Sequence, residues 1–231
     1  MNSNEKMEFP NGVVAVFAKT PRRGAVKTRL QPLLGEDGAL SLHKSLIQFV
    51  FSNLEAAGLC PVEFWVAVGD GTLEGDSLHE DVFTSICNIR NIFEQAAGDL
   101  GARMAGCARQ VLQRAEYVVL VGADCPSVDA DYLRCALGHL EAGADIVIGP
   151  AEDGGYVLLG LRGVPDCLFA EMPWGTADVL ETTRARLRAD GLGWIELEPR
   201  WDVDRPEDLP RWEALRRSAA EREGGGGVAV G

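Results

Sequence analysis

Short apolar runs, separated by longer segments with helical periodicity, make up most of the chain. The runs are rich in Val and Ile and too short for typical helices. We therefore expect buried strands at 13–18, 62–68, 117–122, 145–148, 156–161 and 194–197. Between them apolar residues recur every three or four positions, which predicts helices at 39–57, 100–114, 130–141, 177–189 and 207–219. This alternation predicts one α/β domain, a three-layer α/β/α sandwich around a mostly parallel sheet.

One connection departs from the alternation of strands and helices. The segment 149–155 separates two predicted strands and contains glycines and a proline but no helical pattern. It is too short for a crossover helix, so the two strands should be antiparallel neighbours. The sheet is therefore predicted to be mixed.

Size and composition are those of a single globular domain. The chain has 231 residues, of which 46% are hydrophobic and 25% charged. We expect the domain to span residues 12–215 and both ends, 1–11 and the glycine-rich 221–231, to be flexible. The first residues lack the apolar core of a signal peptide, and no apolar run approaches the roughly 20 residues of a membrane span. The prediction is a cytoplasmic protein without membrane contact.

Positive charge is concentrated in one place. The net charge is −13, which argues against a nucleic-acid partner. Five of the 22 Lys and Arg residues nevertheless fall within eleven positions, where an even spread would place about one; they are Lys19, Arg22, Arg23, Lys27 and Arg29. The run follows the first predicted strand, and α/β proteins hold anions at the carboxyl ends of strands. We therefore expect a small phosphorylated ligand here.

The basic segment is not a P-loop, although Lys27 and Thr28 match the end of that motif. Pro21 and Val26 stand where the motif requires glycines. Backbone amides could not close around phosphates without them. Lys27 and Arg29 would instead bind phosphate through their side chains. The alternative is that these are solvated loop charges.

Two groups of acids follow later strands. Asp124 comes directly after the third predicted strand, and Ser127 or Asp129 can cap the next helix, which leaves Asp124 free for another role. Asp204 is predicted to begin the last helix together with Glu207, and this leaves Asp202 unexplained. Mg²⁺ needs only one or two protein carboxylates when phosphates supply its other ligands. Asp124 with Asp202 or Asp204 would therefore suffice.

The segment 149–156 combines acids with glycines. Asp153 and Gly154 could simply form a hairpin turn. Alternatively the glycines admit a ligand close to the backbone, and Asp153 accepts hydrogen bonds from a hydroxylated acceptor. Further along, Thr176 is expected to cap a helix, and Trp174 is either a core residue or a lid over the ligand.

Histidines and cysteines suggest no chemistry. The histidines His43, His79 and His139 lie away from these motifs, and the six cysteines form no C-x-x-C pair. Reduced, mostly buried thiols are expected.

Six motifs occur in a fixed order along residues 12–215. They are Pro21-x-x-Gly24-x-x-Lys27-Thr28-Arg29-Leu30, Gly98-Asp99-Leu100-Gly101-x-Arg103-Met104, Gly122-x-Asp124-x-Pro126, Gly149-Pro150-Ala151-x-Asp153-Gly154-Gly155-Tyr156, Trp174-Gly175-Thr176 and Asp202-Val203-Asp204. In this the chain resembles the bacterial glycosyltransferase-A-like family labelled rSAM/selenodomain-associated transferase, of the nucleotide-diphospho-sugar transferase superfamily. The resemblance implies that fold, with the nucleotide bound by the amino-terminal half and the acceptor by the later part.

The resemblance also implies roles for individual residues. Lys27 and Arg29 would contact the nucleotide's phosphates, and Asp124 would hold Mg²⁺ or Mn²⁺, completed by Asp204 or, second in preference, Asp202. The nucleotide site would comprise Lys19, Arg22, Gly24, Lys27, Thr28, Arg29 and Asp99. The acceptor site would comprise Asp153, Gly154, Gly155, Tyr156 and Trp174. Asp124, Lys27 and Asp153 would be the catalytic residues. The chain has one acid at Asp124-Cys125-Pro126 where many glycosyltransferases of this fold have D-x-D, and it lacks the G-x-G-T-R loop of sugar nucleotidyltransferases.

Three functions follow from these patterns. The first is metal-dependent transfer of a sugar from a nucleoside-diphosphate-sugar donor to a small acceptor. The second is a nucleotidyltransferase that joins a nucleoside triphosphate to a phosphorylated acceptor and releases pyrophosphate. The third is a nucleotide-binding module without catalysis. The sequence gives no indication of an oligomeric state.

Overall fold

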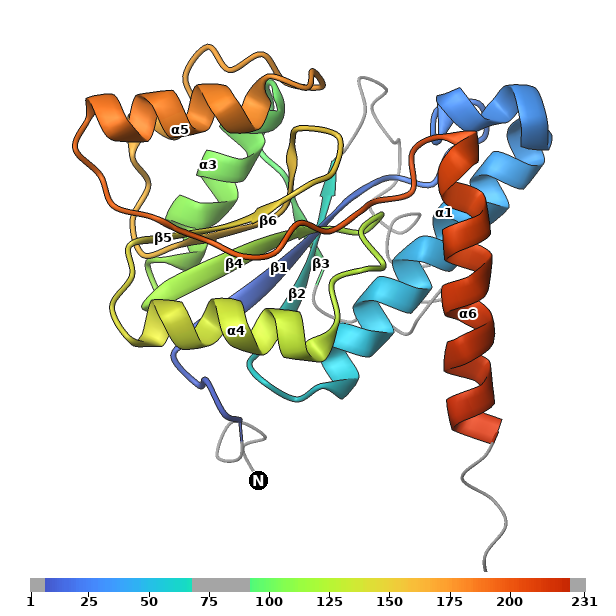
Figure 1. Cartoon of the computed structure of the whole chain (residues 1–231), viewed down its shortest axis with the longest axis horizontal. Helices are drawn as coiled ribbons and strands as arrows, with labels where there is room; N and C mark the ends of the chain where they lie inside the picture. Colours follow the sequence, from blue (N-terminus) through green and yellow to red (C-terminus); the bar gives the residue numbers. More distant parts are fainter. Residues whose placement is uncertain (1–6, 68–91, 225–231) are drawn as a thin grey trace, which may run out of the picture.

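A seven-stranded sheet runs through the part of the protein that the computed structural model describes, residues 7–67 and 92–224 (Figure 1). Its strands are β1 (Gly12–Lys19), β2 (Val62–Ala67), β3 (Ile92–Glu94), β4 (Tyr117–Gly122), β5 (Ile146–Pro150), β6 (Tyr156–Leu161) and β7 (Ile195–Glu196), in the order β3-β2-β1-β4-β6-β5-β7. The six predicted strands are confirmed, except that residue 68 lies outside the described residues. Strand β3 was not predicted, because three residues are too few to show a period.

Strand directions confirm that the sheet is mixed. Strands β3, β2, β1 and β4 are parallel to one another, whereas β6 is antiparallel to both β4 and β5. The 151–155 turn joins β5 to β6 directly, as expected from its length. Strand β7 then pairs parallel with β5 at the edge.

The five predicted helices are all present. They are α1 (Gln31–Ala56), α3 (Leu100–Val111), α4 (Ala130–Glu141), α5 (Val179–Ala189) and α6 (Leu209–Gly224). Helix α1 begins before its predicted start, and Gly35 breaks its first turns with φ 69° and ψ 172°. A short 3₁₀ turn, η2 (Thr28–Leu30), leads into it.

Helices cover both faces of the sheet. Helices α1 and α4 lie on one face and α3 and α5 on the other (Figure 1). Strand β1 is buried on both sides, because Val14 and Val16 pack toward the first pair of helices while Val13 and Ala15 pack toward the second. This is the three-layer sandwich that the strand–helix alternation predicts.

Helix α6 packs against α1 outside the sheet (Figure 1). A third apolar cluster joins the two helices through Leu30, Leu46, Val203 and Trp212. The Trp212 ring also meets Phe49 edge-on, with 5.1 Å between ring centroids. This cluster holds the segment before α6 against the end of the basic loop.

The predicted flexible ends fall mainly outside the described residues, which exclude 1–6 and 225–231. Glu221 to Gly224 belong to helix α6. The domain boundaries 12–215 thus remain a prediction. Within the described ranges, no helix has the length and apolar character needed to cross a membrane.

Candidate active site

The carboxyl ends of neighbouring strands bring the candidate residues together. Strands β1 and β4 are adjacent and parallel, so the loops that follow Lys19 and Gly122 leave the sheet at the same edge. Strand β6 runs the other way beside β4, with Val121 opposite Leu158, so the turn before Tyr156 also lies at this edge. A cleft of about 590 Å³ opens there. Most candidate residues line it, namely Lys19, Lys27, Thr28, Arg29, Asp124, Asp153, Gly155, Tyr156, Trp174, Asp202 and Asp204.

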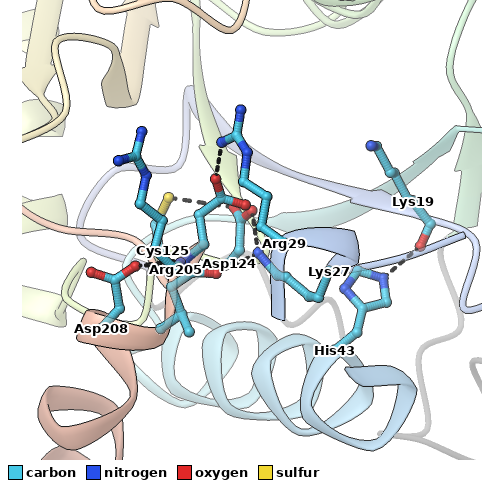
Figure 2. A network of polar contacts seen from close by, with 10 residues as sticks. Lys19, Lys27, Arg29, His43, Asp124, Cys125, Arg205 and Asp208 are labelled. Atoms are coloured by element: carbon cyan, nitrogen blue, oxygen red, sulfur yellow. Dashed lines mark hydrogen bonds and ion pairs between the residues drawn. The ribbon is translucent and has the colours of Figure 1, made fainter. Parts of the chain in front are cut away.

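Lys27 reaches from the basic loop to the acid after β4 (Figure 2). Its Nζ atom donates hydrogen bonds to Oδ2 of Asp124 at 2.9 Å and to the carbonyl oxygen of Val203 at 2.6 Å. The side chain is only 6% exposed. Its backbone has φ 46°, a left-handed conformation that costs a non-glycine residue about 1–3 kcal/mol and tends to occur at functional sites. Burial opposes the charge of the ammonium, but the carboxylates around it, chiefly Asp124 with Asp204 and Asp202, together raise the pKa of Lys27.

Asp124 is free to take this role because another acid caps the next helix. Asp129 Oδ1 accepts a hydrogen bond from the Tyr132 amide at 2.8 Å and caps α4, as predicted. Desolvation would raise the pKa of Asp124, but Lys27 outweighs desolvation and lowers it. The adjacent Cys125 thiol lies 3.7 Å from Asp124 Oδ1, and burial raises its pKa, so it is no activated nucleophile.

Arg29 pairs with Asp204, and this pair lies beside the first one. Its hydrogen bond to the carboxylate is the main cause of a raised Arg29 pKa. The prediction that Asp204 caps the last helix is wrong. Arg205 holds the N-cap position of the 3₁₀ turn η4 (Pro206–Asp208) that leads into α6, and Asp208 Oδ2 accepts hydrogen bonds from the backbone amides of Asp204 and Arg205, at 2.9 and 2.7 Å. The Asp204 side chain is therefore available to the cleft.

Asp202 is a cleft carboxylate without a partner among the described residues. It makes no hydrogen bond or ion pair with any residue in the described ranges. Desolvation, followed by the nearby charges of Asp124 and Asp153, raises its pKa to about 7. An added proton or a cation would relieve this repulsion.

The turn between β5 and β6 has its own structural reason for a glycine. Gly154 has φ +95°, and a Cβ atom there would lie 2.2 Å from the carbonyl oxygen of Ala177. This close internal contact, rather than approach of a ligand, explains the glycine. Asp153 turns its Oδ1 to the Gly155 amide at 3.0 Å, which is a local turn contact, yet its side chain also lines the cleft.

An aromatic wall stands beside this turn. The rings of Tyr156 and Trp174 meet edge-on at 6.3 Å between centroids. Trp174 covers Gly101 in the first turn of α3, where a Cβ would lie 2.9 Å from the indole. Trp174 thus combines packing with a place on the cleft. Thr176 does not cap α5, because Asp178 holds the N-cap position.

Four candidate residues are not in the lining of this cleft: Arg22, Gly24, Asp99 and Gly154. Arg22 lines a neighbouring groove of about 390 Å³ that also contains Lys19 and Arg103. Asp99 caps α3, with its Oδ1 accepting from the Ala102 amide at 2.8 Å. The binding roles of these four residues stay predictions.

Two cleft residues escaped the sequence reasoning. His43 is 6% exposed, lines the cleft and bonds through Nε2 to the Lys19 carbonyl oxygen at 2.9 Å (Figure 2). The sequence feature that could have identified it is the position of a histidine on the apolar face of α1, soon after the basic loop. Gln95 follows β3 and donates to the carbonyl oxygens of Trp65 and Ala18, at 2.8 and 3.3 Å. No pattern marked it, because β3 itself was missed.

The chain belongs to the DUF2064 family, described as uncharacterized proteins conserved in bacteria, whose family model matches residues 40–176. None of the curated proteins matches the chain.

Solved structures identify the fold. A protein from Desulfovibrio desulfuricans G20, provisionally assigned as a nucleotide-diphospho-sugar transferase, is 27% identical, with a TM-score of 0.75 over 90% of this chain and 98% of that one. A cytidylyltransferase from Leptospira borgpetersenii is 14% identical, with a TM-score of 0.58 over 89% and 86%. A 4-diphosphocytidyl-2C-methyl-D-erythritol synthase from Anaerococcus prevotii is 9% identical, with a TM-score of 0.57 over 94% and 100%. The predicted fold is confirmed.

Proposed function

We propose that this protein transfers a sugar from a nucleoside-diphosphate-sugar donor to a small acceptor, with the help of a divalent metal ion. The observation that carries the proposal is the meeting of the basic loop with the acid after β4, through the 2.9 Å contact of Lys27 with Asp124. Cations for phosphates and carboxylates for a metal ion then stand side by side, as a metal-bound diphosphate requires.

The chemistry of the donor set fits Mg²⁺ or Mn²⁺. Carboxylate oxygens are the ligands these ions take, and phosphate oxygens and water complete the coordination. No group of three or more His, Cys, Asp or Glu side chains arranged to hold a metal occurs among the described residues. A site of two carboxylates that relies on the donor's phosphates is therefore the better fit. Bound there, the ion would neutralise charge on the departing diphosphate.

Asp124 and Asp202 are the preferred ligands. Asp204 forms an ion pair with Arg29, whereas Asp202 has no partner among the described residues. Besides desolvation, the neighbouring carboxylates Asp124 and Asp153 contribute to raising the Asp202 pKa. This reverses the order of preference from the sequence, which favoured Asp204. Asp204 would instead position Arg29.

In the reaction, Lys27 and Arg29 bind the phosphates and stabilise the charge that develops on them. The acceptor oxygen forms a bond to the anomeric carbon of the sugar. The bond from that carbon to the β-phosphate oxygen breaks, and its electron pair departs with the nucleoside diphosphate. The acceptor's proton passes to a carboxylate, for which Asp153 at the cleft's far wall is our candidate.

The second candidate is nucleotidyl transfer. Four cationic side chains, Lys19, Lys27, Arg29 and Arg103, line the cleft, and this number would suit a triphosphate donor. In that reaction the acceptor phosphate attacks the α-phosphate and pyrophosphate leaves.

The test is incubation of the full chain with panels of sugar nucleotides and nucleoside triphosphates, each with Mg²⁺ or Mn²⁺. Slow transfer to water makes the donor detectable without its acceptor. Release of a nucleoside diphosphate from one sugar nucleotide, lost in Lys27→Met, would support the proposal. Release of pyrophosphate from a triphosphate, without turnover of any sugar nucleotide, would overturn it in favour of the second candidate.

A further inference from the structure

Charges in the cleft are sorted by their place in the chain. All four lining cations among the described residues come from the first 103 positions, namely Lys19, Lys27, Arg29 and Arg103. The four lining acids all come from position 124 onward, namely Asp124, Asp153, Asp202 and Asp204. By origin in the chain, the cleft therefore has a cationic half, formed around the loop after β1, and an acidic half, formed by the 151–155 turn and the 202–204 segment. The two halves meet where Lys27 and Arg29 pair with Asp124 and Asp204.

Contacts between the halves pair two of the four lining acids of the described residues, and the proposed metal ion would bind Asp202, so Asp153 is the acid left without a counter-charge. Lys27 forms an ion pair with Asp124, and Arg29 forms one with Asp204. Asp153 and Asp202 form no ion pair with any residue of the described ranges. No Lys or Arg from the elements that carry them, between residues 120 and 204, lines the cleft.

The acidic half also carries the apolar surface suited to the body of a ligand. Tyr156 and Trp174 form its wall, and Val179 follows from the start of α5. Trp174 Nε1 is buried without a hydrogen-bond partner among the described residues. An aromatic or aliphatic group would gain apolar contact with this wall.

From this arrangement we infer that the acceptor is an alcohol or amine with an apolar body and no phosphate or other anionic group. Asp153 accepts a hydrogen bond from its hydroxyl or amino group, while Tyr156 and Trp174 hold its apolar part. This inference rests on the proposed function, which assigns the cationic half to the donor.

A phosphorylated acceptor does not suit this half of the cleft. A phosphate beside Asp153 would meet like charge from a carboxylate that forms no ion pair with any described residue, and such juxtaposition is unfavourable in a partly desolvated site. Lys27 and Arg29 reach this half, but they already pair with Asp124 and Asp204, and the proposed function assigns them to the donor's phosphates. The sorting of charge therefore favours sugar transfer to a neutral or cationic acceptor over joining to a phosphate.

The experiment compares matched compounds on the full chain. Benzyl alcohol and 2-phenylethanol, each beside its phosphate monoester, are titrated by saturation-transfer NMR with Mg²⁺ and saturating pyrophosphate, which fills the cationic half. We expect the alcohols to bind about tenfold or more tightly than their phosphate esters. Equal affinity, tighter binding of the esters, or failure of both alcohols to bind would overturn the inference.

Two substitutions locate the effect. Asp153→Lys should strengthen binding of the phosphate esters by about tenfold and change the alcohols little. The matched control is Glu152→Lys, one residue away on an exposed side chain that pairs with Arg211 outside the cleft. The control should leave both affinities unchanged, and an equal response in the two variants would contradict a role for Asp153.

Trp174→Ala should weaken binding of the alcohols, with Trp174→Phe retaining part of it, while pyrophosphate binding is unaffected. An unchanged alcohol affinity in Trp174→Ala would contradict the claim that this side chain binds the apolar part of the acceptor. Failure of the proposed function itself would appear separately, as release of pyrophosphate from a nucleoside triphosphate without turnover of any sugar nucleotide.

Discussion

Lys27 Nζ and Asp124 Oδ2 lie 2.9 Å apart, although 97 positions separate the two residues in the chain. The contact forms because β1 and β4 are parallel neighbours whose following loops leave the sheet together. Both groups are thereby held charged at the place where a phosphate and a metal ion would meet.

Replacing Lys27 should impair phosphate binding far more than replacing another cation of the same loop. Lys27→Met is expected to weaken Mg²⁺–pyrophosphate binding about 10–100-fold, because it removes a buried charged donor. Isothermal titration calorimetry measures the change. Arg23→Met is the control, since Arg23 is exposed, pairs with Glu36 and Asp37 and does not line the cleft. Equal losses in the two variants would mean that the loop acts as a diffuse electrostatic patch.

Asp124 should also matter for stability. Asp124→Asn removes the negative charge that balances the Lys27 ammonium, which is 6% exposed, and leaves it only neutral acceptors, the new amide oxygen and the Val203 carbonyl. Because Asp124 itself is 41% exposed, water compensates in part, and we expect a loss of about 1–3 kcal/mol in the free energy of unfolding. Urea denaturation followed by circular dichroism gives the value. Asp37→Asn, which breaks an exposed ion pair, should show no measurable change. Identical unfolding curves for both variants would refute the prediction.

Metal binding should distinguish Asp202 from Asp204. Asp124→Asn and Asp202→Asn are expected to lower Mn²⁺ affinity in the presence of pyrophosphate by about tenfold or more. Asp204→Asn should have a smaller effect on the ion, because that carboxylate is engaged by Arg29. Electron paramagnetic resonance of free Mn²⁺ measures the bound fraction without any turnover. A larger effect of Asp204→Asn would restore the order of preference inferred from the sequence.

The contribution of Asp202 to the stability of the metal-free protein should fall as pH rises toward neutrality. The pKa of Asp202 is about 7 in the folded protein against an ordinary value of 3.8. The folded state thus holds this proton more tightly than the unfolded chain. Unfolding becomes easier as pH rises between about 4 and 7, and above pH 7 the whole penalty is present.

The variant Asp202→Asn removes this penalty. It should stabilise the protein by about 1–3 kcal/mol at pH 8 and have little effect at pH 4. Urea denaturation in EDTA at several pH values tests this, with the exposed Asp178→Asn as control. If Asp202→Asn shows the same pH dependence as the parent, the carboxylate is not repelled by its neighbours.

The packing of Trp174 against Gly101 can be tested by replacing the glycine. Gly101→Ala places a Cβ 2.7 Å from the Phe169 carbonyl oxygen and 2.9 Å from the Trp174 ring. The clash should cost about 1–3 kcal/mol of stability and change tryptophan fluorescence, despite the better helix propensity of alanine. Gly138→Ala in α4, where nothing lies within 4 Å of the new Cβ, should instead stabilise by about 0.5–1 kcal/mol. If both substitutions stabilise the protein, the Trp174 ring moves away from the new Cβ at residue 101 without a cost in stability.

Much of the fold was predictable because the sequence patterns that define its strands, helices and turns are local. The bounds of β4, β6 and α4 match the prediction, since continuous apolar runs define the strands and Asp129 caps the helix. The antiparallel connection followed from the short turn before Tyr156. Lys27 and Asp124 could be named as candidates because both follow buried strands, and the ends of parallel strands share an edge.

Other features depended on contacts between distant segments. His43 seemed unconnected to the motifs, because its link to them is a hydrogen bond to the Lys19 backbone. The cap of the last helix was assigned to Asp204, since the spacing to Glu207 suits a capping box. The reach of Asp208 back to two amides becomes visible only in three dimensions.

The sequence by itself determined the α/β class, the mixed sheet and the basic loop with its partner acid, because periodicity, turn length and charge clustering act over short stretches of chain. Only the tertiary structure decided which carboxylates of the described residues remain unpaired and that Lys27 and Arg29 meet Asp124 and Asp204 in one cleft. The reason lies in the segment that returns from β7 across the strand ends, bridging Arg200 to Ala151 and Val203 to Asp124. Its path depends on the packing of Val203 and Trp212 against α1, which no local pattern encodes.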